Sequence, residues 1–329
     1  MKFPRRTFFQ LAAGAAALPA VSRTAKAQAY PSRPITMVVP FAAGGNSDTI
    51  GRMLAERMRE PLGQPVIIEN VAGAAGNIGS GRVTRAVPDG HTLIFGNFAT
   101  HVLNGAVYSL PYDLMTDFEP ISLVTTDSLL IVAKKGMIAT NLNELIAWLK
   151  ANPEKASQAT TGNGGVGHVA GLLFQKQTGA RFHFVPYRGV GPAMQDLVAG
   201  QIDLMFDPVG NSLNQVRAGA IKVYAVTAES RLAAAPDIPT AHEAGLPEFY
   251  MSNWQALFGP KGMPKDVILK LNAVVVTALA DPVMRARLAD LGQEIPSPEQ
   301  QTPEALRRRQ RAEIEKWWPV IKAANIKVE

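Results

Sequence analysis

The sequence predicts an α/β fold built from mainly parallel sheets flanked by helices. Short apolar runs rich in valine and isoleucine alternate with amphipathic stretches, a pattern typical of parallel strands covered by helices. Three glycine-rich segments each stand just past a strand-like segment and just before a helical one. About 300 residues follow the N-terminal segment described below. A chain of that length exceeds one ordinary core and predicts two domains.

Seven segments are predicted as strands and three C-terminal segments as helices. The strands are residues 35–41, 66–71, 92–96, 129–133, 182–186, 202–206 and 223–227. The helices are residues 267–280, 283–291 and 303–321, with Asp281-Pro282 as a break between the first two. Apolar stretches near residues 121–132 and 223–258 are each placed to carry the chain between domains. We therefore expect residues 30–127 and 254–329 to form domain 1, and residues 128–253 to form domain 2.

Residues 1–29 have the features of a cleavable export signal. Arg5 and Arg6 precede two phenylalanines and an uncharged apolar stretch over residues 11–21, and Ala27-Gln28-Ala29 has the small-x-small form of a signal-peptidase site. The arginine pair is typical of a twin-arginine signal, with an ordinary secretory signal as the alternative. Either signal predicts a periplasmic protein that begins near Tyr30. The apolar stretch is shorter than the about 20 residues of a transmembrane helix, so a soluble product is expected.

Composition argues against several classes of function. There is no cysteine, which excludes disulfides, thiolate metal sites and cysteine nucleophiles. Removing residues 1–29, with five basic and no acidic residues, leaves 28 basic and 27 acidic residues of the original 33 and 27. A nearly neutral protein gives no electrostatic reason to expect a nucleic-acid partner. The five histidines lack metal-ligand spacing, and no Gly-x-Ser-x-Gly motif or carboxylate pair suggests catalysis. We expect a non-enzyme without metal or cofactor.

The three glycine-rich segments are the candidate ligand-binding loops. They span residues 41–48, 72–79 and 161–168. In open α/β sheets, ligands bind beyond the carboxyl ends of strands, and a helix N-terminus there binds an anion without a cationic side chain. A tight strand-to-helix turn is the alternative explanation of each loop alone. The candidate binding residues are Phe41, Ala42, Ala43, Gly44, Gly45, Ala75, Gly76, Asn77, Thr161, Gly162, Asn163, Gly165 and His168.

Two further residues are candidates outside these loops. Asp207 follows the predicted strand 202–206, where it could bind a ligand amine or hydroxyl group or cap the next helix. Arg188 is placed to pair with the far end of the ligand, or to form an ordinary salt bridge. His168 opens a predicted helix, so local capping or packing is an alternative role for it.

A series of motifs runs in order along the mature chain. They are Pro31-Ser32-Arg33-Pro34-Ile35, Val39-Pro40-Phe41-Ala42-Ala43-Gly44-Gly45 with Asp48 and Arg52, Glu69-Asn70 ahead of Gly73-Ala74 and Gly76-Asn77, Pro88-Asp89-Gly90-His91-Thr92-Leu93, Val185-Pro186-Tyr187-Arg188-Gly189, and Pro192-Ala193 with Asp196-Leu197 ahead of Gly200-Gln201-Ile202-Asp203. In these motifs the chain resembles the substrate-binding receptors of tripartite tricarboxylate transporters, the TctC-like or Bug-type periplasmic proteins.

The resemblance implies a two-lobed periplasmic binding protein, or Venus flytrap, that closes on its ligand and passes it to two integral membrane subunits. It implies that residues 161–168 hold a ligand carboxylate, and that residues 41–45 and 74–77 reach the ligand partly through water. We expect a monomer. Many relatives have proline where Ala42 or Ala43 stands, and serines are common where this chain has Thr160-Thr161, Asn163 and Gly164-Gly165. The ligand is therefore left open among amino acids, di- or tricarboxylates and aromatic acids.

The alternative function is an exported NADP-dependent oxidoreductase. Gly162, Gly164 and Gly167 match the G-x-G-x-x-G pattern of dinucleotide-binding loops. The strand-like segment before them is short and polar, and no acidic residue ends the following strand to bind a ribose. Arg188 stands there instead, and an arginine suits a 2′-phosphate.

Overall fold

The computed structural model describes residues 30–323, so the predicted export signal lies outside the described residues. In chain order the elements are β1 (Ile35–Val39), α2 (Asn46–Leu62), β2 (Val66–Asn70), η1 (Ala74–Gly76), α3 (Asn77–Val83), β3 (Thr92–Asn97), η2 (Ala99–Leu103), α4 (Asn104–Val107), β4 (Phe118–Lys134), α5 (Leu142–Ala151), β5 (Ser157–Thr160), α6 (Val166–Thr178), β6 (His183–Pro186), α7 (Val190–Val198), β7 (Leu204–Pro208), α8 (Val209–Arg217), β8 (Ile221–Val226), β9 (Ser252–Pro260), α9 (Lys265–Ala280), α10 (Pro282–Asp290), η3 (Pro298–Gln300) and α11 (Pro303–Ala323).

The strands form a mixed sheet in the order β2-β1-β3-β9-β4-β7-β5-β6, with β8 also paired to β4. β1 is parallel to β2 and β3, and β5 is parallel to β6 and β7. β4 and β9 run antiparallel to their neighbours. The predicted α/β class is confirmed, as are all seven predicted strands and the three C-terminal helices. Parallel pairing is found among β1, β2 and β3 and among β5, β6 and β7. The long antiparallel strands β4 and β9 lie between these two groups and make the whole sheet mixed.

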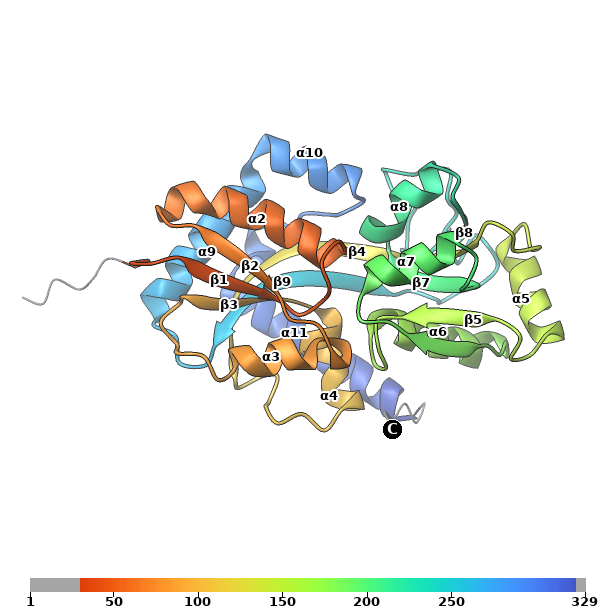
Figure 1. The fold of residues 1–329 in the computed structure, drawn as a ribbon, viewed down its shortest axis with the longest axis horizontal. Helices are drawn as coiled ribbons and strands as arrows, with labels where there is room; N and C mark the ends of the chain where they lie inside the picture. The colour runs from red at the N-terminus through yellow and green to blue at the C-terminus, as the bar shows by residue number, and fades with distance from the viewer. Residues whose placement is uncertain (1–29, 324–329) are drawn as a thin grey trace, which may run out of the picture.

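β4 connects the two halves of the molecule (Figure 1). Its first part, through Ser128, pairs with β9, whereas Leu129–Ala133 pairs with β7 and the last residues of the strand pair with β8. We call the half built on β1, β2 and β3 lobe 1, and the half built on β5, β6, β7 and β8 lobe 2. α2, α9 and α10 cover one face of lobe 1, with α3, α4 and α11 on the other.

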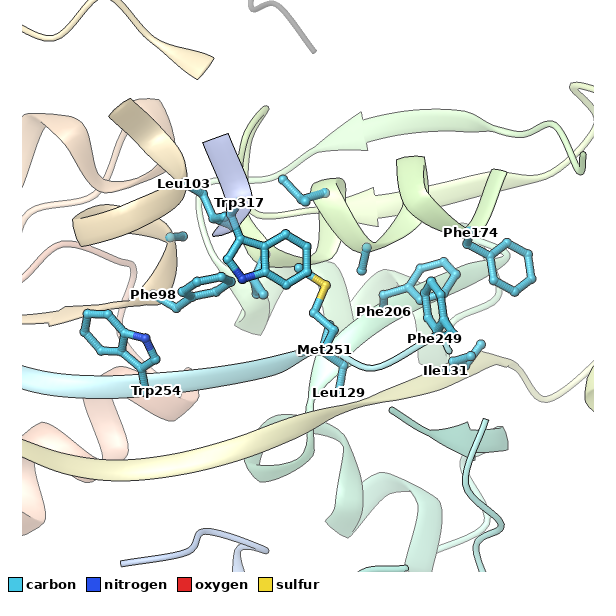
Figure 2. Close-up of a cluster of buried hydrophobic side chains, with 14 of the residues drawn as sticks. Phe98, Leu103, Leu129, Ile131, Phe174, Phe206, Phe249, Met251, Trp254 and Trp317 are labelled. Atoms are coloured by element: carbon cyan, nitrogen blue, oxygen red, sulfur yellow. The ribbon is translucent and has the colours of Figure 1, made fainter. Parts of the chain in front are cut away.

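One apolar core continues from lobe 1 into lobe 2. Figure 2 shows Phe98, Trp254 and Trp317 at one end of this cluster, and Phe174 and Phe206 at the other. The ring centroids of Phe98 and Trp317 are 5.8 Å apart, and those of Phe174 and Phe206 are 5.1 Å apart. Separate apolar clusters fill the α2, α9 and α10 side of lobe 1 and the α7 and α8 side of lobe 2.

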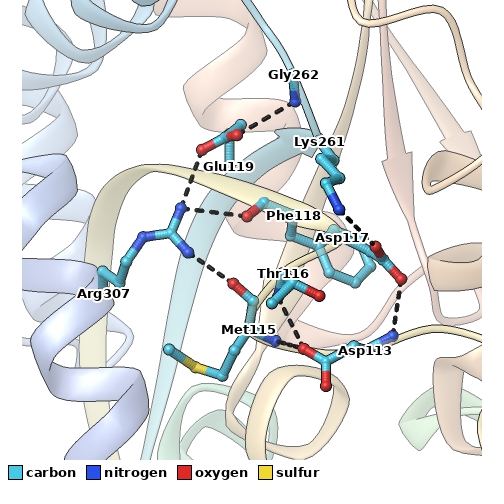
Figure 3. A network of polar contacts seen from close by, with 9 residues as sticks. All are labelled: Asp113, Met115, Thr116, Asp117, Phe118, Glu119, Lys261, Gly262 and Arg307. Carbon is cyan, nitrogen blue, oxygen red and sulfur yellow. Dashed lines mark hydrogen bonds and ion pairs between the residues drawn. The ribbon is translucent and has the colours of Figure 1, made fainter.

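The C-terminal helix is fixed to lobe 1 by Arg307 (Figure 3). Its guanidinium donates to the Met115 carbonyl at 2.7 Å and pairs with Glu119 at 2.9 Å. Glu119 also accepts a hydrogen bond from the Gly262 N–H at 3.2 Å. Arg307 thus joins α11 to the start of β4 and to the turn after β9, and α11 also contacts η2 and α4.

Candidate ligand-binding cleft

The predicted loops meet at the junction of the two lobes. The loop after β1 leads into α2, the loop after β2 leads into α3, and the loop after β5 leads into α6. A pocket, here called the inner pocket, lies between the α2 loop of lobe 1 and the α6 loop of lobe 2. It is lined by Phe41, Ala42, Gly45, Asn46, Ser47, Asp48, Asn97, Ala159, Thr160, Thr161, Val166, Gly167, Val190, Met205, Phe206, Asp207, Pro208, Asn211, Asn253 and Gln255.

The lobes touch around this pocket, so the structure shows a closed cleft. The backbone N–H of Asn46 in lobe 1 donates to Asn211 Oδ1 in lobe 2, and the Tyr108 hydroxyl donates to the Asn163 carbonyl. Gly162 has φ +102°, and a Cβ there would lie 3.2 Å from the backbone nitrogen of Ala75. A Cβ at Gly164 would likewise lie 2.9 Å from Val107 Cγ1, so Gly162 and Gly164 of the third loop allow close contact with the opposite lobe.

Two helix N-termini point into the inner pocket. α2 is preceded by Gly45 and α6 by Gly165, neither of which has a side chain to cap its helix; the first N–H of α2, that of Asn46, is bound by Asn211 Oδ1. Ser47 from the first turn of α2 and Val166 and Gly167 from α6 line the pocket. The N–H groups of a helical first turn lack partners within the helix and carry the positive end of its dipole. The pocket can therefore bind an anion from both lobes through backbone groups.

Polar side chains without partners form the far wall of the pocket. Gln255 on β9 is 1% exposed, and within residues 30–323 neither its amide nitrogen nor its oxygen has a hydrogen-bond partner. The Thr160 hydroxyl and the Asn253 amide oxygen are likewise buried and unpartnered in the described chain. Buried polar groups are almost always hydrogen-bonded in native proteins. All three residues line the inner pocket, so these groups are available to a polar molecule inside the cleft.

Two buried carboxyl groups stand beside this wall. Asp207 is the second-last residue of β7 and accepts hydrogen bonds from Asn211 Nδ2 at 3.1 Å and from the Ser212 hydroxyl. Asp127 on β4 accepts from Asn253 Nδ2 at 2.9 Å and Gln293 Nε2 at 2.8 Å. Burial raises the pKa of Asp207 to about 7 and that of Asp127 to about 6, because a low-dielectric site disfavours the charged form.

The sequence-predicted residues are distributed over neighbouring surfaces. Phe41, Ala42, Gly45, Thr161 and Asp207 line the inner pocket. An outer pocket adjoins it across Phe41 and Thr161 and includes Ala75, Gly76, Gly162, Asn163 and Arg188. Gly44 lines a groove outside the N-terminus of α2.

Four predicted residues, Ala43, Asn77, Gly165 and His168, line none of these surfaces. His168 Nδ1 accepts the Gly164 N–H at 2.8 Å, and its ring packs edge-on to Phe184 with the centroids 4.5 Å apart. Burial lowers the pKa of His168 to about 4. The Asn77 side chain accepts a hydrogen bond from Asn104 at 2.6 Å. His168 and Asn77 thus hold their loops in shape.

The sequence did not predict the lining residues that come from outside the loops, which are Asn97, Ala159, Thr160, Val190, Met205, Phe206, Pro208, Asn211, Asn253 and Gln255. One signal was available for Gln255, because a polar residue interrupts the apolar run Trp254-Gln255-Ala256-Leu257-Phe258. Asn211 stands four residues beyond Asp207, in the first turn of α8, and its Nδ2 donates to Asp207 Oδ1.

Within the described residues, no group of three or more His, Cys, Asp or Glu side chains is arranged to hold a metal ion. In the same part of the chain, no single helix is long and apolar enough to cross a membrane. Only α9 and α10 taken together reach that length and composition, and they are bent by 72° at their junction.

Comparison with known proteins identifies the relatives of this chain. Residues 50–326 match the model of the tripartite tricarboxylate transporter family receptor. A UPF0065 protein of Agrobacterium vitis is 38% identical over 90% of this chain and 86% of its own length.

Three solved structures share the fold over their full lengths. The periplasmic binding protein BugD has a TM-score of 0.87 at 38% identity over 91% of this chain. MatC from Rhodopseudomonas palustris with bound malate has a TM-score of 0.86 and is 40% identical over 89% of this chain. Rpa4515 from R. palustris with adipate has a TM-score of 0.86 and is 32% identical over 91% of this chain.

Proposed function

Because this chain belongs to the tripartite tricarboxylate transporter family receptors, we propose that it is a periplasmic receptor for a small carboxylate. It captures the ligand in the inner pocket between its lobes and delivers it to two integral membrane subunits of a tripartite transporter. The observation that carries this proposal is the inner pocket itself. Two helix N-termini, each preceded by a glycine, enter it from opposite lobes, and the described residues that line it include no lysine, arginine or histidine.

The ligand carboxylate binds at the N-terminus of α6 in this proposal. The Thr161 hydroxyl and the N–H groups of Val166 and Gly167 bind it from lobe 2, and Ser47 binds it from lobe 1. The rest of the ligand reaches Gln255 and the other unpartnered groups of the far wall. The outer pocket, with Ala75, Asn163 and Arg188, forms the entrance.

The related structures support a carboxylate as the ligand. MatC is seen with malate and Rpa4515 with adipate, and both molecules are dicarboxylic acids that differ in length and in the hydroxyl group of malate. The polar far wall of this chain favours an acid with a second polar group over a purely apolar tail.

Closure links capture to delivery. Residues 30–127 and 254–329 form the first moving body and residues 128–253 the second, with the hinge where β4 and β9 pass between them. The change of pairing partner between Ser128 and Leu129 supports this division. A ligand that binds the closed state better than the open one shifts the protein to the closed form, which the membrane subunits would recognise. The protein acts as a monomer without a cofactor.

A thermal-shift screen of the mature protein tests the proposal. The panel contains malate, adipate, aspartate, citrate, benzoate and NADP. A bound acid at 100 times its Kd should stabilise the protein by about 2.7 kcal/mol. Thr161→Val should abolish that shift, whereas Thr277→Val, which removes a hydroxyl on the exposed surface of α9, should preserve it. Stabilisation by NADP alone would contradict the proposal and favour the dinucleotide alternative.

A further inference from the structure

The two buried carboxyl groups of the cleft have no cationic partner. Asp207 is 1% exposed and Asp127 is 5% exposed. The hydrogen bonds to Asp207 come from Asn211 and Ser212, and those to Asp127 come from neutral amides. Among the described residues, no lysine, arginine or histidine lies within salt-bridge distance of either carboxyl group. Asp207 borders the space that the proposed ligand occupies.

The other titratable groups around Asp207 do not compensate its charge. Asp127 faces it from β4 and adds a repulsive charge, and Glu294 adds another next to Asp127. Asp48 of α2 also lines the pocket and is paired with Arg52 at 2.9 Å. His168 of α6 is neutral at physiological pH, because burial lowers its pKa to about 4. Arg188 lies in the outer pocket. Two helix N-termini are the remaining positive features.

A fully ionised dicarboxylate would place two more negative charges in this space. Carboxyl groups that share a desolvated site cannot all remain ionised, so one of them takes up a proton. Asp207 is the group placed to do so, because it borders the ligand and lies near Asp127. A protonated Asp207 becomes a hydrogen-bond donor, which can then bind a ligand oxygen.

Resting on the proposed function, we propose that a dicarboxylate binds in this cleft together with one proton from solvent, which Asp207 holds in the closed complex. An acid that carries an ammonium group balances the same charges itself and binds without that proton. Burial already raises the pKa of Asp207 to about 7 in the closed cleft without a ligand, which agrees with this role.

Calorimetric titration in buffers of different ionisation enthalpy counts the protons. Malate, adipate and aspartate are titrated at several pH values from 5.5 to 8.5. For malate or adipate we expect uptake of about one proton at the alkaline end, and a Kd that rises about tenfold per pH unit there. Aspartate should bind without uptake.

Asp207→Asn should remove both the proton uptake and the pH dependence. Asp203→Asn is the matched control, because Asp203 lies on the same lobe outside the cleft and is paired with Lys134 at 2.7 Å; it should retain both. Dicarboxylate binding without proton uptake, or uptake that persists in Asp207→Asn, would overturn the inference alone. Failure of malate, adipate and aspartate to bind at any pH would overturn the inference, and failure of citrate and benzoate as well would overturn the proposed function with it.

Discussion

Two buried glutamines differ in what their amides contact. Gln310 Nε2 on α11 donates to the carbonyls of His101 and Leu114, both at 2.9 Å, whereas the Gln255 amide has no partner within residues 30–323. A buried polar group left unsatisfied costs about 1–3 kcal/mol. The fold therefore gains stability from Gln310, whereas a ligand in the cleft would supply hydrogen-bond partners for Gln255.

We predict opposite effects when each glutamine becomes leucine. Gln310→Leu should lower the free energy of unfolding by about 1–3 kcal/mol, because two buried carbonyls lose their donor. Gln255→Leu should leave it unchanged or raise it, while the Kd of the acid found in the screen rises by about tenfold or more. Urea denaturation and calorimetric titration measure the two effects. A Gln255→Leu protein as destabilised as Gln310→Leu would show a structural role for Gln255.

His168 makes stability depend on pH. Its pKa is lowered by burial from 6.5 to about 4, so it contributes stability that is present above pH 6.5 and lost as the pH falls toward 4. The raised pKa values of Asp127 and Asp207 act in the opposite direction, because their contribution is lost as pH rises. The wild-type profile alone would therefore mix the two effects.

The difference between wild type and His168→Asn isolates the histidine. Asparagine keeps an acceptor for the Gly164 N–H but does not titrate. Between pH 7.5 and pH 5 the stability advantage of the wild type over this variant should shrink by about 2 kcal/mol, as measured by urea unfolding at both pH values. A constant difference for His168→Asn would mean that its ring protonates freely in the folded protein.

Sequence periodicity predicts the elements of each lobe better than those that join them. β1, β3 and β7 are short apolar runs bounded by loops, so their positions follow from local pattern. β9 is buried along all but its first residue, and a strand buried on both faces lacks the alternation that marks a strand with one exposed face. Only part of β4 was predicted as a strand, although it extends over 17 residues.

The same distinction applies to the cleft. The glycine-rich loops could be placed because a strand-to-helix turn is a local signal. The far wall could not be predicted from the sequence. The antiparallel pairing of β9 with β3 brings Gln255 opposite Asn97, and these residues are more than 150 positions apart in the chain. Contacts of that range depend on topology, which residue pattern alone does not determine.

Asp127 is hydrogen-bonded to three segments of the chain at the junction of the two lobes. This residue lies in β4 opposite Asn253 of β9, one position before the two strands cease to pair. It accepts hydrogen bonds from Asn46 at the start of α2 and from Gln293 beyond α10. Gly210 at the start of α8 packs so closely that a Cβ there would lie 2.3 Å from Asn46 Oδ1 and 2.8 Å from Gln293 Nε2. Lobe 2 thus contacts lobe 1, through Gly210, at the two side chains that Asp127 binds.

Gly189 offers a test of closure that leaves each lobe intact. Its φ of 175° is extended backbone open to any residue, yet a Cβ there would lie 2.8 Å from Ala42 Cβ and 3.2 Å from Ala42 N across the cleft. Gly189→Ala should therefore disfavour only the closed state. An extra methyl in a packed contact costs typically about 1–3 kcal/mol, so the ligand Kd should rise by roughly 5- to 150-fold.

The variant's unfolding in urea should stay close to that of the wild type, because the three atoms nearest to the added methyl all belong to Ala42 of the opposite lobe. Small-angle scattering should show a larger radius of gyration for Gly189→Ala than for the wild type at the same ligand concentration, and excess ligand should bring the two together. Gly136→Ala is the matched control, since a Cβ at Gly136 meets nothing within 4 Å. If Gly189→Ala bound the acid as tightly as Gly136→Ala, the liganded lobes would have to be further apart at Ala42 than they are in this structure. Capture would then depend on a wider cleft, with water between the two loops.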